Sequence, residues 1–90
     1  MPERTVTVAS SVGLHARPAT IFVQAVAKQP VKVTIAKPGK APVDARSVLS
    51  VLGLDVRGGQ EVILAAEGDG AEAALDDLTA LLSKDMDKEP

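Results

Sequence analysis

The stretch GLHARPA at residues 13–19 places a loop directly before a predicted helix, with the only histidine of the chain at the junction. Pro18 suits the first turn of a helix, because the backbone N–H that proline lacks would have no helical partner there. Beyond it, apolar residues follow the i, i+3, i+4, i+7 spacing of a helix that buries one face, at Ala19, Phe22, Val23 and Val26. The stretch therefore predicts a loop in which Gly13 is free to take a positive φ, followed by a helix from about Ala16 to Lys28.

His15 and Arg17 are the candidate functional residues of this junction. A helix start leaves several backbone N–H groups unpaired and carries partial positive charge, so an adjacent imidazole and guanidinium are equipped to receive a phosphoryl group. Arg17 opposes the helix dipole at about 0.3–1 kcal/mol, whereas a charge-assisted hydrogen bond to an anion contributes about 1.5–3 kcal/mol. From these residues alone it stays open whether Arg17 is only an exposed residue and His15 only a loop residue, since short motifs also match by chance.

Three segments, at about residues 5–9, 31–36 and 61–66, have the composition of half-buried strands, and a short strand at about residues 41–44 would close a hairpin with the second of them. In the first, Val6 and Val8 share the apolar face. Lys37–Lys40, with proline and glycine at its centre, predicts a type II turn between the second and third strands. Because Pro42 cannot donate a hydrogen bond to a ladder, the third strand is expected at a sheet edge.

The apolar run Ser47–Leu54 would suit a strand by composition, but its flanking residues favour a helix of about two turns. Ser47 is the expected N-cap, and Gly53 lies near the expected C-terminus. The residues expected to line the core are Val48, Val51 and Leu54, and those expected to point outward are Leu49 and Leu52. The alternatives are that all five are buried, or that two exposed leucines have no function.

The last helix is predicted from a stripe of apolar residues: Ala71, Ala74, Leu75, Leu78, Leu81 and Leu82. Asp69 is expected to cap it, with Glu72 reaching back in a variant of the capping box. Lys84 suits the negative end of this helix, and residues 85–90 are expected to fray.

The predicted order β-α-β-β-α-β-α is typical of an α+β sandwich, because strands with one apolar face need helices on one side only. Residues 1–90 are expected to form a single domain with one modest core. Cysteine is absent and histidine occurs once, which argues against disulfides and a metal site. A net charge of −2 with one aromatic residue argues against nucleic acid as a partner. Neither a membrane span nor a signal peptide is recognisable, so we expect a cytoplasmic protein.

GLHARPA resembles the active-site motif of the HPr family, the histidine-containing phosphocarriers of the bacterial phosphoenolpyruvate-dependent sugar phosphotransferase system. The likeness extends from Arg4 to about Leu82 and includes a second motif at residues 44–53. It implies a four-stranded antiparallel sheet of order 1-4-2-3 with three helices on one face. It also implies that His15 takes the phosphoryl group on Nδ1, while Arg17 and the backbone N–H groups of Ala16 and Arg17 bind its oxygens.

The resemblance also implies partners. The chain would accept its phosphoryl group from enzyme I and pass it to enzyme IIA domains, as a monomeric carrier in a relay rather than a free-standing enzyme, and without a cofactor. The family positions that contact these partners match Thr20, Gln24, Leu49 and Leu52. Two rival functions remain: a regulatory paralogue that serves other acceptors, and a binding module in which His15 carries no phosphate.

Ser47 matches a serine that is a regulatory phosphorylation site in many Gram-positive relatives, so the resemblance adds a serine kinase and phosphatase as partners at this residue. The competing interpretation, which we favour, is a helix cap that contributes about 1 kcal/mol relative to alanine. A helix start would tolerate an added phosphate well.

Overall fold

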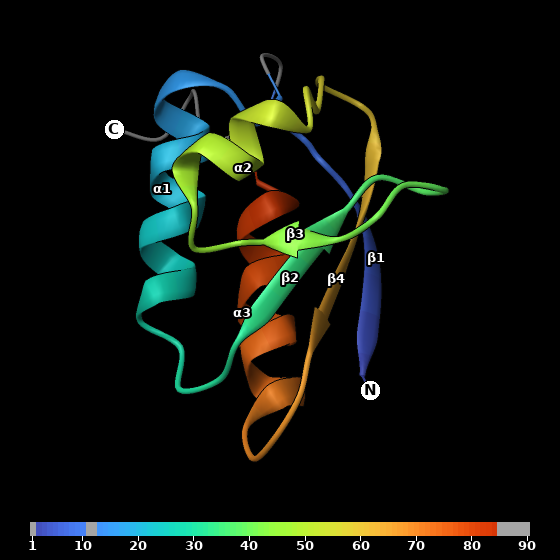
Figure 1. Ribbon diagram of the computed structural model, residues 1–90. Helices are drawn as coiled ribbons and strands as arrows, with labels where there is room; N and C mark the ends of the chain where they lie inside the picture. Colours follow the sequence, from blue (N-terminus) through green and yellow to red (C-terminus); the bar gives the residue numbers. More distant parts are fainter. Residues whose placement is uncertain (1, 11–12, 85–90) are drawn as a thin grey trace.

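A computed structural model of the chain, which describes residues 2–10 and 13–84, is an open-faced sandwich (Figure 1). Its elements are β1 (Glu3–Thr7), α1 (Ala16–Ala27), β2 (Val33–Ala36), β3 (Val43–Asp44), α2 (Val48–Gly53), β4 (Glu61–Ala66) and α3 (Ala71–Leu82). The strands form one antiparallel sheet in the order β1-β4-β2-β3, and the helices lie on one side of it. The predicted fold class, element order and sheet order are thereby confirmed. The expected fraying of residues 85–90 concerns a segment outside the described residues.

One hydrophobic core lies between the sheet and the helices. Strand β4 is central, since it pairs with β1 and with β2, and α3 packs against β1 and β4. The alternating residues predicted to face inward are buried: Val6, Val8, Val62, Leu64 and Ala66. Helix α1 contributes its predicted face, Ala19, Phe22, Val23 and Val26, and packs against α2 and α3. The single aromatic ring, Phe22, is fully buried, so most of this core consists of small aliphatic contacts.

The hairpin between β2 and β3 follows its turn residues. The Lys40 N–H donates to the Lys37 carbonyl at 3.0 Å, and Gly39 has a φ of 80°, as a type II turn requires. Strand β3 is two residues long and lies at the sheet edge, directly after Pro42. The predicted edge position is therefore confirmed, although the strand is shorter than expected.

Helix α3 begins differently from the prediction. Its N-cap is Gly70, with a φ of 91° and no side-chain hydrogen bond, so the expected capping box from Asp69 and Glu72 is wrong. The physical reason is the tight turn out of β4, which uses left-handed backbone at Gly68 and Gly70 and moves Asp69 one position away from the cap. The buried stripe itself is as predicted, except that Leu81 is only partly buried.

Helix α2 exposes the apolar residues of its first turn and packs those of its second turn, Val51 and Leu52, against the core. Val51 is fully buried and Leu54 packs against the core, as expected. Leu49 points outward, with 83% of it exposed, but Val48 is also exposed and Leu52 packs partly against the core. The predicted division is thus wrong for Val48 and only partly right for Leu52, because the helix is held at its C-terminal half and its first turn projects beyond the core.

No helix among residues 2–10 and 13–84 has both the length and the apolar character needed to cross a bilayer.

Candidate functional site

The imidazole of His15 lies at the surface, at the start of α1. His15 is the N-cap of this helix, with extended backbone (φ −130°, ψ 159°), and its side chain makes no capping hydrogen bond. Its side chain is 38% exposed. As at any helix start, the first backbone N–H groups have no acceptors within the helix. The ring is therefore accessible and stands beside donors that suit an anion.

Two loops meet behind the imidazole. The Leu14 N–H donates to the Val56 carbonyl at 2.9 Å, and both side chains are fully buried. Gly13 has a φ of 72°, and a Cβ there would collide with the Val56 carbonyl oxygen and Arg57 Cα. The glycine of the motif is thus needed for its positive φ, as predicted, and also for a close approach between segments over forty residues apart in the sequence.

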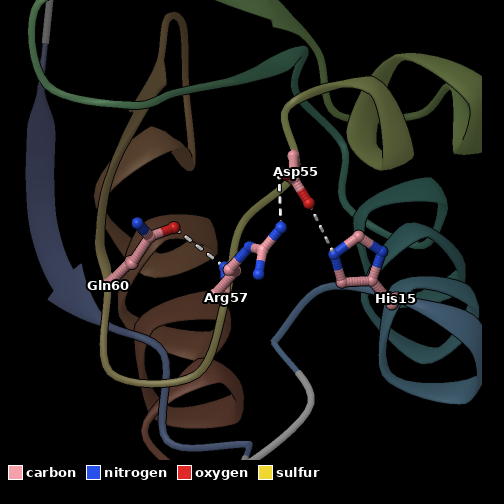
Figure 2. A network of polar contacts seen from close by, with 4 residues as sticks. All are labelled: His15, Asp55, Arg57 and Gln60. Atoms are coloured by element: carbon pink, nitrogen blue, oxygen red, sulfur yellow. Dashed lines mark hydrogen bonds and ion pairs between the residues drawn. The ribbon is translucent and has the colours of Figure 1, made fainter.

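This junction brings an acidic residue to His15. The Asp55 Oδ1 atom lies 3.2 Å from Nε2 of His15, and Figure 2 shows the other ring nitrogen, Nδ1, turned away from the carboxylate. The second oxygen, Oδ2, accepts from Nη2 of Arg57 at 3.3 Å. The Arg57 guanidinium, by hydrogen bond and charge, holds the pKa of the Asp55 carboxyl below its ordinary value, and Lys37 and His15 add smaller effects in the same direction.

The loop that carries Asp55 is itself anchored. The Arg57 backbone N–H donates to Oε1 of Gln60 at 2.9 Å (Figure 2). Directly after β1, the Val8 N–H donates to the Gln60 carbonyl and the Gly59 N–H donates to the Val8 carbonyl, both at 2.9 Å. Asp55 was not among the predicted site residues. Nothing in a single sequence joins it to His15, because their proximity depends on how the loop after α2 packs against the loop before α1.

The predicted phosphate ligand Arg17 is exposed in the first turn of α1. Its guanidinium has no hydrogen-bond or ion-pair partner within the part of the chain that the structure describes. Thr20 and Gln24 are exposed as well, and with Arg17 they occupy positions i, i+3 and i+7 on one face of the helix. Arg17 is therefore free to reach an anion at His15.

The other predicted residues lie on α2. Ser47 is its N-cap, and the Ser47 Oγ accepts from the Ser50 N–H at 3.2 Å, which confirms the predicted cap. Leu49 is strongly exposed, while Leu52 is partly buried against the core. Helix α2 packs against α1, so these residues and the exposed face of α1 belong to adjacent helices.

Within residues 2–10 and 13–84, no group of three or more histidine, cysteine, aspartate or glutamate side chains is arranged to hold a metal ion.

The chain matches, over residues 2–84, the family model described as the PTS HPr component phosphorylation site. It belongs to the HPr family. The phosphocarrier protein HPr of Streptomyces coelicolor is 50% identical over 90 residues, which cover 100% of this chain and 97% of that protein. The HPr-like protein Crh of Bacillus subtilis is 36% identical over 86 residues, covering 96% and 100%.

Solved structures of HPr proteins share the fold described above. The crystal structure of HPr-C-His from Thermoanaerobacter tengcongensis matches with a TM-score of 0.90 at 37% sequence identity, and covers 100% of both chains. The resemblance carried by GLHARPA is thereby confirmed, and with it the role of a phosphocarrier of the phosphotransferase system.

Proposed function

We propose that Nδ1 of His15 is the atom that carries the phosphoryl group, which arrives from phosphorylated enzyme I and leaves to an enzyme IIA domain. The observation that carries this proposal is the position of the imidazole, which is exposed at the open start of α1 with Nδ1 turned away from its Asp55 partner. Membership of the HPr family supplies the class of reaction and the kind of partners.

Phosphoryl transfer requires a nucleophile and groups that bind the phosphoryl oxygens. The Nδ1 lone pair attacks phosphorus, and the bond from phosphorus to the donor breaks as the N–P bond forms. The Arg17 guanidinium and the backbone N–H groups of Ala16 and Arg17 bind the phosphoryl oxygens, so catalysis consists mainly of positioning and charge stabilisation. In the second transfer the electron pair of the N–P bond returns to Nδ1 as the acceptor attacks.

The docking surface of this proposal consists of Thr20 and Gln24 on α1 and Leu49 and Leu52 on α2. Leu49 supports it most strongly, because it is 83% exposed on α2, which packs against the helix that begins at His15. Leu52 is expected to contribute only its accessible edge, since it also packs against the core.

The decisive experiment is incubation of the chain with enzyme I and phosphoenolpyruvate, followed by analysis of the phosphorylated residue. Acid-labile, base-stable phosphate on His15 is the expected result. His15→Ala is the matched control, which should take up none. If the unaltered chain takes up no phosphate after long incubation, it is a binding module instead. A panel of acceptor domains then distinguishes a sugar-transport carrier from a regulatory paralogue.

The chain acts as a cytoplasmic, single-domain monomer, supported by its one shared core and by the fact that Val48 and Leu49 are the large hydrophobic residues exposed among those described. Sedimentation analysis tests the monomer.

Phosphorylation of Ser47 by a serine kinase remains a prediction from the resemblance. It would add charge at the residue that caps α2, and mass spectrometry of the protein from its own cells would detect it.

A further inference from the structure

Asp55 has an unusual backbone conformation. Its φ is 52°, and it is the single non-glycine residue with positive φ in the described part of the chain. This left-handed region is sparsely populated by residues other than glycine, although aspartate and asparagine enter it more readily than most. Helix α2 ends two residues earlier, at Gly53, where sequence reasoning expected the glycine of the helix terminus. A side chain is thus retained at a position where glycine would be free of strain, which points to a task for that side chain.

The task is indicated by what the carboxylate contacts. One oxygen lies 3.2 Å from Nε2 of His15 and the other 3.3 Å from Nη2 of Arg57. The carboxylate is held in place from both sides, because Leu14 bonds to Val56 between the two loops and Gln60 fixes the backbone of Arg57. The lowered pKa of Asp55 keeps it ionised, so it can only accept hydrogen bonds.

An ionised carboxylate at Nε2 determines the tautomer of the ring. A neutral imidazole carries one proton, and a contact with an acceptor is favourable only if Nε2 carries it. The lone pair then resides on Nδ1, which Figure 2 shows on the side of the ring away from Asp55. We propose that Asp55 is a positioning residue for phosphoryl transfer, which holds Nε2–H of His15 and so presents Nδ1 as the nucleophile.

The same contact acts on the phosphorylated state. When Nδ1 attacks, no proton leaves the ring: the N–P bond forms with the Nδ1 lone pair, the bond to the donor breaks, and the imidazole becomes a cation that retains Nε2–H. The Asp55 carboxylate stabilises that cation, while Arg57 offsets the negative charge that an incoming phosphoryl group would otherwise meet. This inference rests on the proposed function of His15.

The competing interpretation is that Asp55 merely pairs with Arg57 to shape the loop. Two substitutions separate the interpretations. Asp55→Asn keeps the size and the tolerance of a left-handed backbone but removes the charge, and Asp55→Gly removes the side chain and relaxes the backbone. Arg57→Gln removes the other partner of the carboxylate, and Asp69→Asn is the matched control, because Asp69 is an exposed acid away from this site.

Two measurements are made on each variant. Nitrogen-15 NMR of the imidazole reports the tautomer, and rapid-quench kinetics with phosphorylated enzyme I reports the rate of transfer. We expect an Nε2–H tautomer in the unaltered chain and in Asp69→Asn, and loss of that preference in Asp55→Gly and Asp55→Asn. Transfer should slow about two- to fivefold in both Asp55 variants, the size typical of an exposed charge pair.

The outcomes are distinguishable. If the unaltered chain is phosphorylated on His15 but the Asp55 variants keep its tautomer and transfer rate, Asp55 is not a positioning residue and the proposed function stands. If Arg57→Gln loses the tautomer preference and slows transfer as much as the Asp55 variants do, the Asp55–Arg57 pair acts by shaping the loop, and the loop interpretation replaces the proposal. If the unaltered chain takes no phosphate, the proposed function fails and this inference with it. Thermal unfolding verifies that each variant is folded.

Discussion

The starts of α1 and α2 are built from the same backbone conformation but serve opposite purposes. His15 and Ser47 are both N-caps with extended backbone, yet the Ser47 hydroxyl accepts from the Ser50 N–H whereas the His15 side chain turns away to Asp55. Neither helix has an acidic residue in its first turn, and α1 has Arg17 there instead. The cap residue of α2 thus satisfies one of the first donors of its own helix, whereas the cap residue of α1 does not and directs its side chain to a residue of another loop. The absence of a capping bond from His15 thus distinguishes a helix start with a functional side chain from one, at Ser47, whose side chain stabilises the helix.

The largest expected effect comes from removing the side chain that does not cap. His15→Ala should abolish phosphate incorporation from enzyme I, because the nucleophile is gone. Its thermal unfolding should change little, since the imidazole makes no capping bond and its contact with the Asp55 carboxylate lies at the surface. Incorporation of radiolabelled phosphate measures the effect. Retained incorporation would place the acceptor elsewhere and remove the basis of the comparison.

Gly13→Ala tests the packing behind the open helix start. The new Cβ would meet the Val56 carbonyl oxygen and Arg57 Cα, in a backbone conformation that disfavours side chains. We expect the free energy of unfolding to fall by about 2–4 kcal/mol, from left-handed strain together with overpacking. Chemical denaturation measures it. Gly39→Ala is the control, because that residue shares the positive φ but has open space around it, so it should lose only the strain component.

Arg17→Lys tests whether the exposed Arg17 guanidinium in the first turn of α1 binds the phosphoryl group. Lysine keeps the charge but loses the planar fork that binds two oxygens, so both transfer steps should slow about tenfold. Stability should stay unchanged, because Arg17 is exposed. Rapid-quench kinetics give the rate of transfer from enzyme I to His15 and the rate of transfer from His15 to an acceptor domain. Rates equal to those of the unaltered chain would exclude this role.

Leu49→Glu tests whether the first turn of α2 takes part in docking rather than in chemistry. Leu49 is 83% exposed, so a charge there should leave the fold intact while weakening binding of enzyme I about fivefold to tenfold. Calorimetric titration gives the affinity. Ala73→Glu, on the exposed side of α3, is a control at a helix that the docking surface does not include. An unchanged affinity in Leu49→Glu would mean that Leu49 has no role in binding enzyme I.

The smallest expected effect comes from the side chain that does cap. Ser47→Ala should lower the free energy of unfolding by about 1 kcal/mol, because the Ser50 N–H loses its acceptor. Phosphorylation of His15 should proceed at the unaltered rate. Denaturant titration together with the phosphorylation assay measures both. A large loss of transfer in this variant would mean that the two helix starts are coupled, contrary to the comparison.

Some features of the fold could be predicted because their causes are local. Pro18 and the apolar spacing after it predict α1, and the Ser47 hydroxyl predicts its own bond to a donor three residues away. Pro42 predicts an edge strand for the same reason, since the missing N–H is a property of one residue. The cap of α3 does not follow from the side chain of Asp69, because the turn out of β4 uses left-handed backbone at Gly68 and Gly70 and makes Gly70 the N-cap.

The sequence by itself determined which side chains can take part in the chemistry of this protein, namely the imidazole of His15 and the guanidinium of Arg17. It also determined that a helix begins beside them, because Pro18 suits a first helical turn. Only the tertiary structure decided how the imidazole is held. Asp55 reaches His15 because Gly13 lets the loop at residues 56–57 approach within backbone contact, and the orientation of Val48 and Leu52 follows from where α2 rests on the core. Contacts between segments far apart depend on packing geometry, which periodicity and capping signals along a single chain do not contain.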